Sequence, residues 1–415
     1  MAVDIDSILK PFQRFGVHLG LERIEQLLFS LGNPHHNVPI IHVAGTNGKG
    51  SVCAYLSSIL TQAGYKVGRY TSPHLIDWNE RICLNEQPIS VEALQSLLIK
   101  VIDAINLTTE SPTQFEVITA AAWLYFAQSK VDIAVVEVGL GGRLDATNIC
   151  CPLVTVITSI SREHWQQLGS TLTEIATEKA GIIKPGCPVV VGQLPLEAQN
   201  VVRSRLTKLN CPAVVVEPAT ELPIVNGQRW ASYQNIDYPL PLLGFIQLSN
   251  STIAISTIQV LQQKGWEIPT KAISDGMQKT RWLGRLQWVK YGDLPLLIDG
   301  AHNPAAAQAL RQYADTLEAP ITWVMGMLST KDHPEIFTAL LRSLDSLHLV
   351  PVPDHSSADP LDLAVIARTI CPNLATCQTH EDLFSALKTV QSDRPVILCG
   401  SLYLVGYFLK SLPSP

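Results

Sequence analysis

The stretch IIHVAGTNGKGS at residues 40–51 decides the fold class of this chain. Its first five residues, Ile40–Ala44, are rich in β-branched and apolar side chains, as in a strand buried on both faces. A glycine-rich turn follows, and apolar side chains then return at helical spacing over Val52–Ala63, with Gly64 as a stop signal. The sequence therefore predicts a strand, a tight turn and a helix in succession, which is the context of a phosphate-binding loop.

The turn itself has the residue types that hold a nucleoside triphosphate. It consists of Gly45, Thr46, Asn47, Gly48, Lys49, Gly50 and Ser51. Glycines let backbone N–H groups approach phosphate oxygens, and the helix N-terminus adds favourable partial charge. Lys49 would neutralise the β- and γ-phosphates, and the Ser51 hydroxyl would ligate Mg²⁺. The spacing differs from the usual GxxxxGK[ST] because Gly50 separates the lysine from the serine. The alternative is a glycine-rich turn whose lysine is merely solvated.

Short apolar runs alternate with amphipathic segments along the rest of the chain, which predicts parallel sheets flanked by helices. In the first half the further expected strands are Ile133–Val138, Leu153–Thr158 and Val189–Val191. In the second half the strands are Leu296–Ile298, Ile321–Met325, Leu347–Val350 and Val396–Cys399, with helices around Ala305–Leu317, Pro334–Leu344 and Glu381–Val390. We expect an α/β protein with an N-terminal P-loop-type ATPase domain (1–280), a hinge at 276–284 and a C-terminal Rossmann-like domain (285–415).

Composition excludes several classes of protein. The formal net charge of −6 and the pI near 6.0 argue against binding to nucleic acid or to an anionic membrane. The nine cysteines have no zinc-ligand spacing and suit a reducing compartment. The N-terminus has no signal-peptide pattern, and no apolar stretch of about 18 residues occurs. We expect a cytoplasmic protein, and we expect it to be a monomer.

Further motifs follow the phosphate loop in a fixed order. They are Thr71–Leu75 (TSPHL), Asn79–Ile82 (NERI), Phe115-Glu116, Glu137–Asn148 (EVGLGGRLDATN), Glu178–Ile182 (EKAGI), Asp299–Pro304 (DGAHNP) and Gly400–Leu404 (GSLYL). Together with GTNGKGS they resemble folylpolyglutamate synthase and the bifunctional dihydrofolate synthase/folylpolyglutamate synthase of the Mur ligase superfamily. The resemblance runs in family order from about residue 41 to residue 406.

The resemblance implies an ATP-dependent ligase that adds L-glutamate to folates, and to dihydropteroate, through an acyl phosphate. The first domain would be the Mur-ligase-type ATP-binding domain and the second the glutamate-ligase domain. ATP would be a substrate and Mg²⁺ would occupy two sites.

The resemblance also implies roles for single residues. Metal ligands would be Ser51, Glu137, His164 and Lys179, the last if carbamylated. The folate would contact Ser72, Pro73, His74, Arg81, Phe115 and Glu116. Besides the phosphate loop, ATP would contact Asn250, Arg285 and Asp299, and glutamate would contact His302 and Ser401. The catalytic residues would be Lys49, Lys179 and His302.

Several of these residues have a plainer structural alternative. Glu137 follows a buried strand, where an ionised carboxylate needs a partner, and that partner is either Mg²⁺ or Arg143. His164 is structural as readily as it is a ligand. Lys179 would otherwise be a surface lysine, and Ser401 would otherwise cap the last helix.

Four positions depart from the family pattern. Glu163 stands where the family has Asp before the histidine, Ile246 replaces a histidine, and Thr330 replaces the first Asp of a DKD motif. These three departures affect the surroundings of the metal and of the adenine. The fourth, Leu283, replaces the proline of a WPGR motif and leaves Arg285 in place.

Two other functions remain as alternatives. A cell-wall Mur-type amino-acid ligase uses the same chemistry but usually has a further domain ahead of the phosphate loop, and only 44 residues precede Gly45. A nucleotide-binding switch without ligase activity would have no use for Glu137, Lys179 and the second-domain motifs together.

Overall fold

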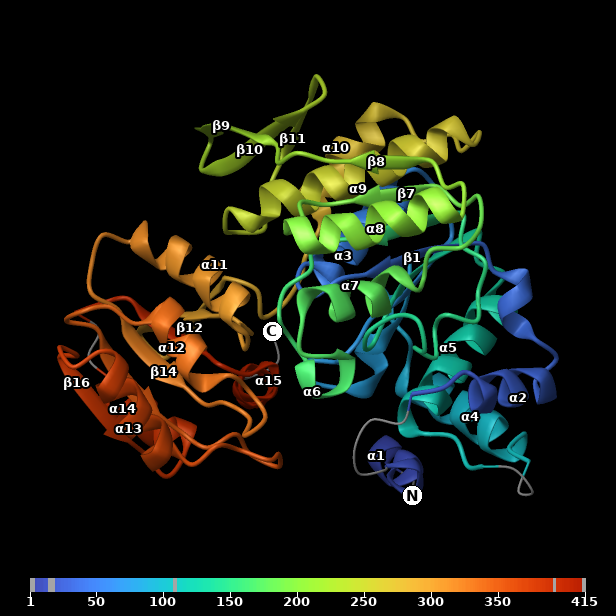
Figure 1. Cartoon of the computed structure of the whole chain (residues 1–415). Coiled ribbons are helices and arrows are strands. Elements are labelled where there is room, and N and C mark those ends of the chain that lie inside the picture. Colours follow the sequence, from blue (N-terminus) through green and yellow to red (C-terminus); the bar gives the residue numbers. More distant parts are fainter. Residues whose placement is uncertain (1–3, 14–18, 107–109, 391–392, 413–415) are drawn as a thin grey trace. The chain divides into compact units, whose positions relative to one another are not determined.

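The computed structural model describes residues 4–13, 19–106, 110–390 and 393–412. The chain divides into two compact units, which are described separately here (Figure 1). Unit 1 comprises Met1–Pro241 and Leu248–Thr280, and unit 2 comprises Leu242–Gln247 and Arg281–Pro415. The chain therefore passes between the units three times, because the six residues 242–247 belong to unit 2. Residues 276–279 of the expected hinge are the last turn of helix α10 (Thr270–Lys279).

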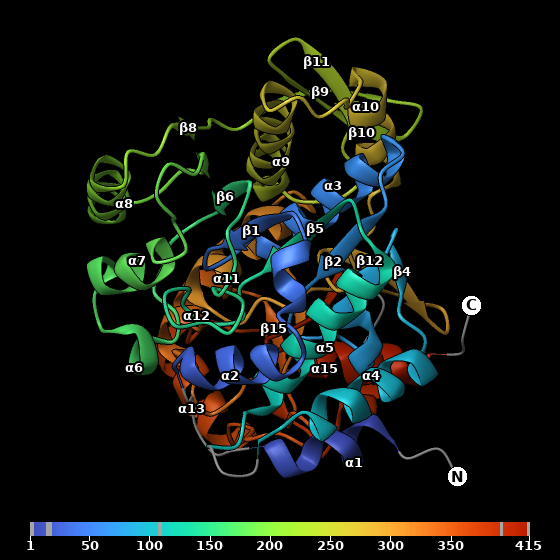
Figure 2. The same cartoon turned by 90° about the vertical axis from the view of Figure 1, so that its right-hand side faces the viewer.

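An eight-stranded sheet forms the centre of unit 1, in the order β4-β3-β2-β5-β1-β6-β7-β8 (Figure 2). Its strands are β1 (Ile40–Ala44), β2 (Val67–Tyr70), β3 (Ile82–Leu84), β4 (Gln87–Pro88), β5 (Ile133–Glu137), β6 (Val154–Ile157), β7 (Val189–Val191) and β8 (Ala213–Val215). The neighbours in the run β2-β5-β1-β6-β7-β8 all pair in parallel, and β3 and β4 add an antiparallel edge next to β2. This arrangement confirms the predicted ATPase-type domain with a mostly parallel sheet.

Helices cover both faces of this sheet. The helices of unit 1 are α1 (Ile5–Leu9), α2 (Glu22–Ser30), α3 (Lys49–Gln62), α4 (Val91–Asp103), α5 (Gln114–Ser129), α6 (Trp165–Leu168), α7 (Leu172–Ala180), α8 (Leu196–Lys208), α9 (Ile246–Gln263, which begins in unit 2) and α10, with short 3-10 turns at Lys10–Phe12, Pro34–Asn37 and Trp78–Arg81. On one face, α2, α4 and α5 share a hydrophobic core with Ile40 and Val136, and α7 and α8 share another with Ala44 and Val189. On the other face, α3 packs against the sheet and α10.

Helix α3 is buried on nearly all sides, which explains why it has no polar, solvent-facing stripe. All ten residues from Ser51 to Leu60 are buried. A helix between a sheet and another helix has no solvent stripe, so its apolar residues do not follow a clean one-sided pattern. The helix was predicted as Val52–Ala63, but it begins at Lys49, directly after the turn.

A small antiparallel sheet in unit 1 was not predicted. Its strands are β9 (Thr220–Val225), β10 (Gln228–Tyr233) and β11 (Ile236–Pro239), in the order β11-β10-β9 (Figure 1). Two-residue turns at 226–227 and 234–235 join them, with Asn226, Gly227, Gln234 and Asn235 at positive φ. These are the residue types and conformations of tight hairpin turns.

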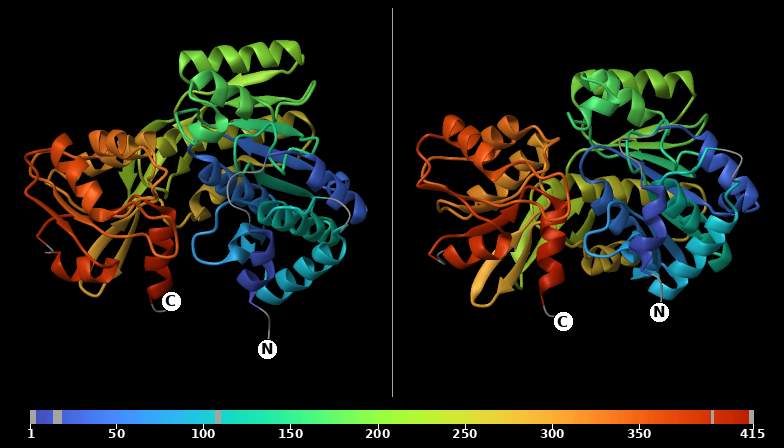
Figure 3. Two further views of the ribbon diagram at one scale, coloured as in Figure 1. Left: turned by 60° about the horizontal axis from the view of Figure 1, so that its bottom comes forward. Right: turned by 90° about the horizontal axis from the view of Figure 1, so that it is seen from below.

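Unit 2 contains a six-stranded sheet in the order β12-β13-β17-β14-β15-β16 (Figure 3). Its elements are β12 (Gln287–Tyr291), β13 (Leu294–Ile298), α11 (Pro304–Asp315), β14 (Thr322–Met325), α12 (His333–Leu340), β15 (Ser346–Leu349), α13 (Pro360–Ile370), β16 (Thr376–Thr379), α14 (Leu383–Thr389), β17 (Val396–Cys399) and α15 (Leu402–Ser411). All strands except β12 pair in parallel, which confirms the predicted C-terminal α/β domain.

The hydrophobic core of unit 2 lies between its sheet and helices α11, α12 and α13, and includes Trp323 and Phe337. Strands β12 and β16 were not predicted from the sequence. Both are edge strands with half-exposed or exposed side chains, so they lack the apolar run that marks a buried strand. Helix α12 ends at Leu340, four residues before the predicted Leu344, because Leu341 is extended.

Candidate active site

The phosphate loop follows the strand at the centre of the unit 1 sheet. Strand β1 pairs with β5 on one side and with β6 on the other, and all three run in parallel. The loop at residues 45–48 therefore leaves the carboxyl edge of the sheet between the ends of two other strands, where open α/β sheets bind ligands. Helix α3 starts at Lys49 without any spacer.

Two glycines give the loop its path. Gly45 has φ +153°, and a Cβ there would lie 1.9 Å from the Thr158 hydroxyl oxygen. Gly48 has φ +86° and precedes α3, and a Cβ there would lie 2.4 Å from Asn250 Oδ1. A side chain at either position would be both strained and blocked. Asn250, expected at the nucleotide, is buried on α9 against the loop.

The end of β6 holds the loop in place through contacts that the sequence did not reveal. The Thr46 amide donates to the Ser159 carbonyl at 2.7 Å, and its hydroxyl donates to the Ser161 carbonyl at 3.1 Å. The Asn47 amide donates to the Ser159 hydroxyl at 3.0 Å, and the Thr158 hydroxyl donates to the Asn47 carbonyl at 2.7 Å. No sequence pattern links 46–47 to 158–161, since the pairing depends on β1 and β6 being neighbours.

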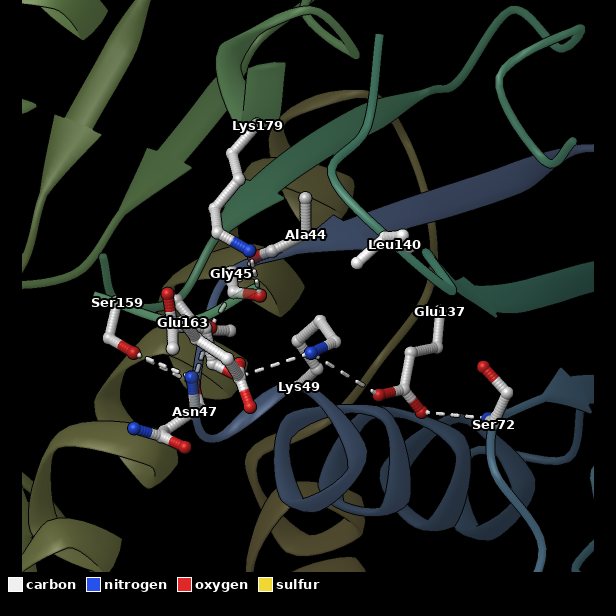
Figure 4. A network of polar contacts seen from close by, with 12 residues as sticks. Ala44, Gly45, Asn47, Lys49, Ser72, Glu137, Leu140, Ser159, Glu163 and Lys179 are labelled. Atoms are coloured by element: carbon white, nitrogen blue, oxygen red, sulfur yellow. Dashed lines mark hydrogen bonds and ion pairs between the residues drawn. The ribbon is translucent and has the colours of Figure 1, made fainter. Parts of the chain in front are cut away.

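Lys49 lies between the loop and the end of β5 (Figure 4). Its Nζ donates to the Thr46 carbonyl at 3.1 Å and lies 4.0 Å from Glu137 Oε1. The other oxygen of the buried Glu137 carboxylate accepts from the Ser72 amide at 3.3 Å. The side chain of Arg143, the alternative partner of Glu137, instead pairs with Glu178 at 2.9 Å.

Lys179 is buried, so the surface-lysine alternative is wrong. Its Nζ donates to the Gly45 carbonyl at 2.8 Å, directly behind the phosphate loop (Figure 4). Burial, with Lys49 adding to the effect, lowers the pKa of Lys179 to about 7, whereas Glu163 and Asp145 act in the opposite direction. A lysine amine with such a pKa is partly neutral at neutral pH.

The loop at 139–148 braces the end of α7, which carries Lys179. A Cβ at Gly142 would lie 2.8 Å from the Glu178 carbonyl, and one at Gly181 would lie 2.3 Å from Arg143 Cβ, so both positions require glycine. Asp145 organises the loop from inside, because its buried carboxylate accepts from the Leu140 amide at 2.8 Å and the Thr147 amide at 3.0 Å. Burial raises the pKa of Asp145, and these hydrogen bonds oppose the rise. The sequence motif contained Asp145, but no role was assigned to it.

His164 precedes α6 and lies next to Glu163, whose charge acts on Lys179. It has φ +48°, its side chain is 43% exposed, and its Nε2 is 3.9 Å from Glu163 Oε1. Ser51 is buried in the first turn of α3. Within the described ranges, no cluster of three or more His, Cys, Asp or Glu side chains could by itself hold a metal ion.

The expected folate residues fall into two groups. In the first group, Ser72 and Pro73 are joined by a cis peptide bond after the end of β2. The buried Arg81 donates to His74 Nδ1 at 3.0 Å, and its guanidinium lies 4.5 Å from the centre of the Trp78 ring. Trp78 is a contact that the sequence did not predict.

Phe115 and Glu116 open helix α5. The Phe115 ring packs against Gly139. The Glu116 carboxylate accepts from the Thr113 amide at 2.6 Å, which completes a capping box, and pairs with Arg23 at 3.1 Å. These contacts give Glu116 a structural role, and its contact with folate stays a prediction.

Of the residues expected in unit 2, Asp299 and His302 follow β13 and Ser401 follows β17, whereas Arg285 precedes β12. Asp299 is buried, and its carboxylate accepts from the Leu286 amide at 2.9 Å and the Ala301 amide at 2.8 Å. Burial raises the pKa of Asp299, whereas the charge of Arg285 lowers it. His302 contacts the Gly300 carbonyl through Nδ1 at 2.7 Å.

Ser401 caps α15, as its structural alternative required, because its hydroxyl accepts from the Tyr403 amide at 3.2 Å. Ile246, which departs from the family pattern, is exposed. Asp332, two residues after the departure at Thr330, directly precedes helix α12. Among the described residues, no helix is both long and apolar enough to cross a membrane.

Two protein-family models match the chain. The Mur ligase middle domain matches residues 43–258, and the dihydrofolate synthetase C-terminal domain matches residues 284–411. The second match favours a folate-type ligase over both alternatives, the cell-wall ligase and the nucleotide switch, because its description is that of dihydrofolate synthetase.

Curated relatives cover the chain almost completely. Dihydrofolate synthetase of Saccharomyces cerevisiae is 34% identical, over 95% of this chain and 98% of its own. Folylpolyglutamate synthase of Lacticaseibacillus casei is 36% identical, over 94% of both chains. Dihydrofolate synthase/folylpolyglutamate synthase of Bacillus subtilis is 34% identical, over 96% of both chains.

Solved structures agree in fold. Mycobacterium tuberculosis folylpolyglutamate synthase complexed with ADP has a TM-score of 0.89 and 29% identity, and covers 99% of this chain and 98% of its own. E. coli FolC in complex with DHPP and ADP has a TM-score of 0.83 and 29% identity, over 97% and 95% of the two chains.

Proposed function

The chain belongs to the folylpolyglutamate synthase/dihydrofolate synthase family of ATP-dependent glutamate ligases, and from that premise we propose which residues carry each step. The observation that carries the proposal is Lys49, which lies between the glycine turn and Glu137. That position suits a side chain that follows the γ-phosphoryl group as it moves from ATP to an acceptor carboxylate.

The carboxylate of a pterin acid must first be activated, because oxide is a poor leaving group. Transfer of the γ-phosphoryl group gives an acyl phosphate. Lys49 neutralises the charge on the transferring oxygens, and backbone N–H groups of residues 48–50, at the start of α3, bind the remaining phosphate oxygens. The amine of glutamate then attacks the acyl carbon, the tetrahedral intermediate collapses, and phosphate leaves.

Magnesium fits the residues around Glu137. The buried Glu137 carboxylate has the oxygen chemistry that Mg²⁺ prefers, and Ser51 adds a hydroxyl in the first turn of α3. Phosphate oxygens and water would complete the coordination, since Mg²⁺ needs few protein ligands. Bound there, the ion would neutralise charge on the phosphates. For a second ion we propose His164 and a carbamylated Lys179.

Carbamylation of Lys179 has a physical basis in its surroundings. Only a neutral amine adds to carbon dioxide, and the pKa of about 7 keeps much of the amine neutral. The product is an anion in a place where a buried cation is costly.

We propose that the remaining expected residues act on the substrates. Ser72, Pro73, His74, Arg81, Phe115 and Glu116 bind the pterin acid. Asn250, Arg285 and Asp299 bind the nucleotide, and His302 and Ser401 bind the incoming glutamate. Domain 1–280 would hold ATP and domain 285–415 would hold glutamate, with the hinge at 276–284.

We propose that both dihydropteroate and reduced folates are acceptors. The relatives named for one activity, for the other and for both are 34–36% identical to this chain, so identity does not favour one acceptor. The B. subtilis relative carries both names at full coverage, which supports a single chain with two activities. Since the E. coli relative was solved with DHPP and ADP, a pteroate-type acid is a suitable acceptor for this chain as well.

The test is an acceptor comparison. The protein is incubated with ATP, labelled glutamate and either dihydropteroate or tetrahydrofolate, and product is separated by chromatography. Labelled product is expected with both acceptors. Product with only one acceptor would contradict the dual specificity, and ATP hydrolysis without any labelled product would contradict the ligase mechanism.

A further inference from the structure

Loops after three neighbouring strands of unit 2 are pressed together at the carboxyl edge of the sheet. A Cβ at Gly326, after β14, would lie 2.7 Å from the Val350 carbonyl and 3.1 Å from Leu404 Cδ2. A Cβ at Gly400, after β17, would lie 2.6 Å from the Gly326 carbonyl. The turns that follow β14, β15 and β17 therefore meet backbone to backbone.

The loop after β15 is also tied to the loop after β14 along its length. The Ser329 amide donates to the Ser356 carbonyl at 2.9 Å, and the Ala358 amide donates to the Met327 carbonyl at 2.8 Å. Inside the loop, the Val352 amide donates to the Ser357 hydroxyl at 3.0 Å. These bonds on both sides of His355 fix the backbone from which its exposed side chain projects.

The His355 ring lies flat on the ring of Tyr403. The ring centres are 3.7 Å apart and the planes differ by 26°. Tyr403 is the second residue of α15, and its amide is the one that Ser401 caps. A stacked imidazole keeps both ring nitrogens at its free edge, where they can bind a ligand. His355 is thus placed beside the helix start that carries Ser401.

This edge of the sheet suits an anionic ligand with two separate carboxylates. Helices α11 and α15 both begin here, and helix N-termini attract anions. The Ser401 hydroxyl accepts from Tyr403, which leaves its proton free to donate. Lys331 lies on the loop that is tied to the His355 loop. Glutamate has two carboxylates, and each needs its own donors if the amine is to stay free for attack.

We propose that His355, stacked on Tyr403, is a specificity-determining residue for the incoming amino acid and donates a ring N–H to a carboxylate of the glutamate that docks at Ser401. This inference rests on the proposed function of Ser401. Neither the motifs nor the family resemblance pointed to His355, since the position lies outside every motif.

The test compares the KM values of the three substrates. His355→Ala should raise the KM for glutamate about ten- to a hundredfold, the range for loss of a hydrogen bond to a charged group. The KM values for ATP and for the pterin acid should stay within about twofold. His355→Gln, which keeps an N–H donor, should recover most of the loss. Tyr403→Leu, which removes the stacking surface, should raise the KM for glutamate in the same direction.

The matched control is Ser356→Ala, because that side chain is exposed on the same loop and only its carbonyl makes the contact with Ser329. The control should behave like the unaltered protein, and thermal unfolding should show that all variants are folded. An active His355→Ala with an unchanged KM for glutamate, or with an equal rise for all three substrates, overturns this inference alone. If the unaltered protein makes no glutamate-dependent product, the proposed function falls instead.

Discussion

Lys49 and Lys179 have the same side chain in different surroundings. Lys49 lies in the first turn of α3, with its Nζ 4.0 Å from the Glu137 carboxylate. Lys179 is buried behind the loop with Lys49 as a nearby cation, which brings its pKa to about 7. We propose different tasks for the two residues at one site: Lys49 contacts the phosphates, and Lys179 is an amine that can be modified.

Replacing Lys49 tests the charge. In Lys49→Ala the transferring oxygens lose their neutralising cation, so acceptor-dependent ADP formation should fall by at least about 100-fold. The measurement is a coupled ADP assay with and without the pterin acid. Lys66→Ala, at an exposed lysine of the same unit, should retain full activity. Near-normal turnover in Lys49→Ala would remove the lysine from the mechanism.

Removing and restoring carbon dioxide tests whether Lys179 is carbamylated. The folded-state pKa of about 7 lies below the usual 10.5, so the amine is largely protonated at pH 6 and largely neutral at pH 8. Protein depleted of carbon dioxide at pH 6 should lose activity and regain it with bicarbonate at pH 8, and native mass spectrometry should show the added carboxylate. Lys179→Ala should not respond. Activity that ignores bicarbonate, with no added mass, would contradict the carbamate.

At the scale of elements, only the four-residue turn 45–48 joins β1 to α3, and the shape of this turn depends on neighbouring elements. Gly45 packs against the end of β6, and Gly48 packs against Asn250 on α9. The turn is therefore shaped by two elements that come 110 to 200 residues later in the chain.

Alanine at Gly48 and at Gly64 distinguishes backbone strain from steric overlap. Both glycines have positive φ and lie at opposite ends of α3. A Cβ at Gly48 meets Asn250 at 2.4 Å, whereas a Cβ at Gly64 meets nothing within 4 Å. Both alanine variants should lose about 1 kcal/mol of stability from backbone strain. Only Gly48→Ala should weaken binding of a non-hydrolysable ATP analogue, by at least about tenfold in calorimetry. Equal binding by both variants would mean that Asn250 does not support the loop.

Variants of Glu116, at the start of α5, distinguish a structural role of this residue from a role in binding the pterin acid. Its pair with Arg23 is partly buried, with side-chain exposures of 3% for Glu116 and 10% for Arg23. Removing one partner leaves the other without its ion pair, which should cost about 1–3 kcal/mol. We expect Glu116→Ala and Arg23→Ala each to lower the urea midpoint, with the double variant less damaged than the sum. If Glu116→Ala kept normal stability and raised only the KM for the pterin acid, Glu116 would be a substrate contact.

For the whole molecule, the phosphate loop and its supports lie entirely in unit 1, while the residues assigned to glutamate lie in unit 2. The units have separate hydrophobic cores, so each resembles a domain that folds around its own centre. We therefore expect the contacts of the phosphate loop with the nucleotide to depend on the folding of unit 1.

A ligand that binds only the folded state should raise the unfolding temperature. With a non-hydrolysable ATP analogue at 100 times its Kd, the native state gains about 2.7 kcal/mol. We expect scanning calorimetry to show this shift for the unaltered protein and for Lys66→Ala, but not for Lys49→Ala. A shift of equal size in Lys49→Ala would place the nucleotide elsewhere.

The sequence by itself determined the strand–turn–helix unit, the two α/β series and the family. Glycine, lysine and buried-strand patterns are local, so they can be recognised without any tertiary contact. Strands β1, β7 and β17 have the predicted bounds, whereas the edge strands β12 and β16 and the β9–β11 sheet were missed because half-exposed strands have no apolar run.

Only the tertiary structure decided which side chains meet. It brings Lys179 into contact with Gly45, which lies 134 positions earlier in the chain, and it places Lys49 opposite Glu137. It also pairs Arg143 with Glu178, and Glu116 with Arg23. It also stacks His355 on Tyr403. The physical reason is that pairing between strands brings distant loops to one edge of a sheet. Burial and neighbouring charge then act across that edge, and neither is written in the local order of residues.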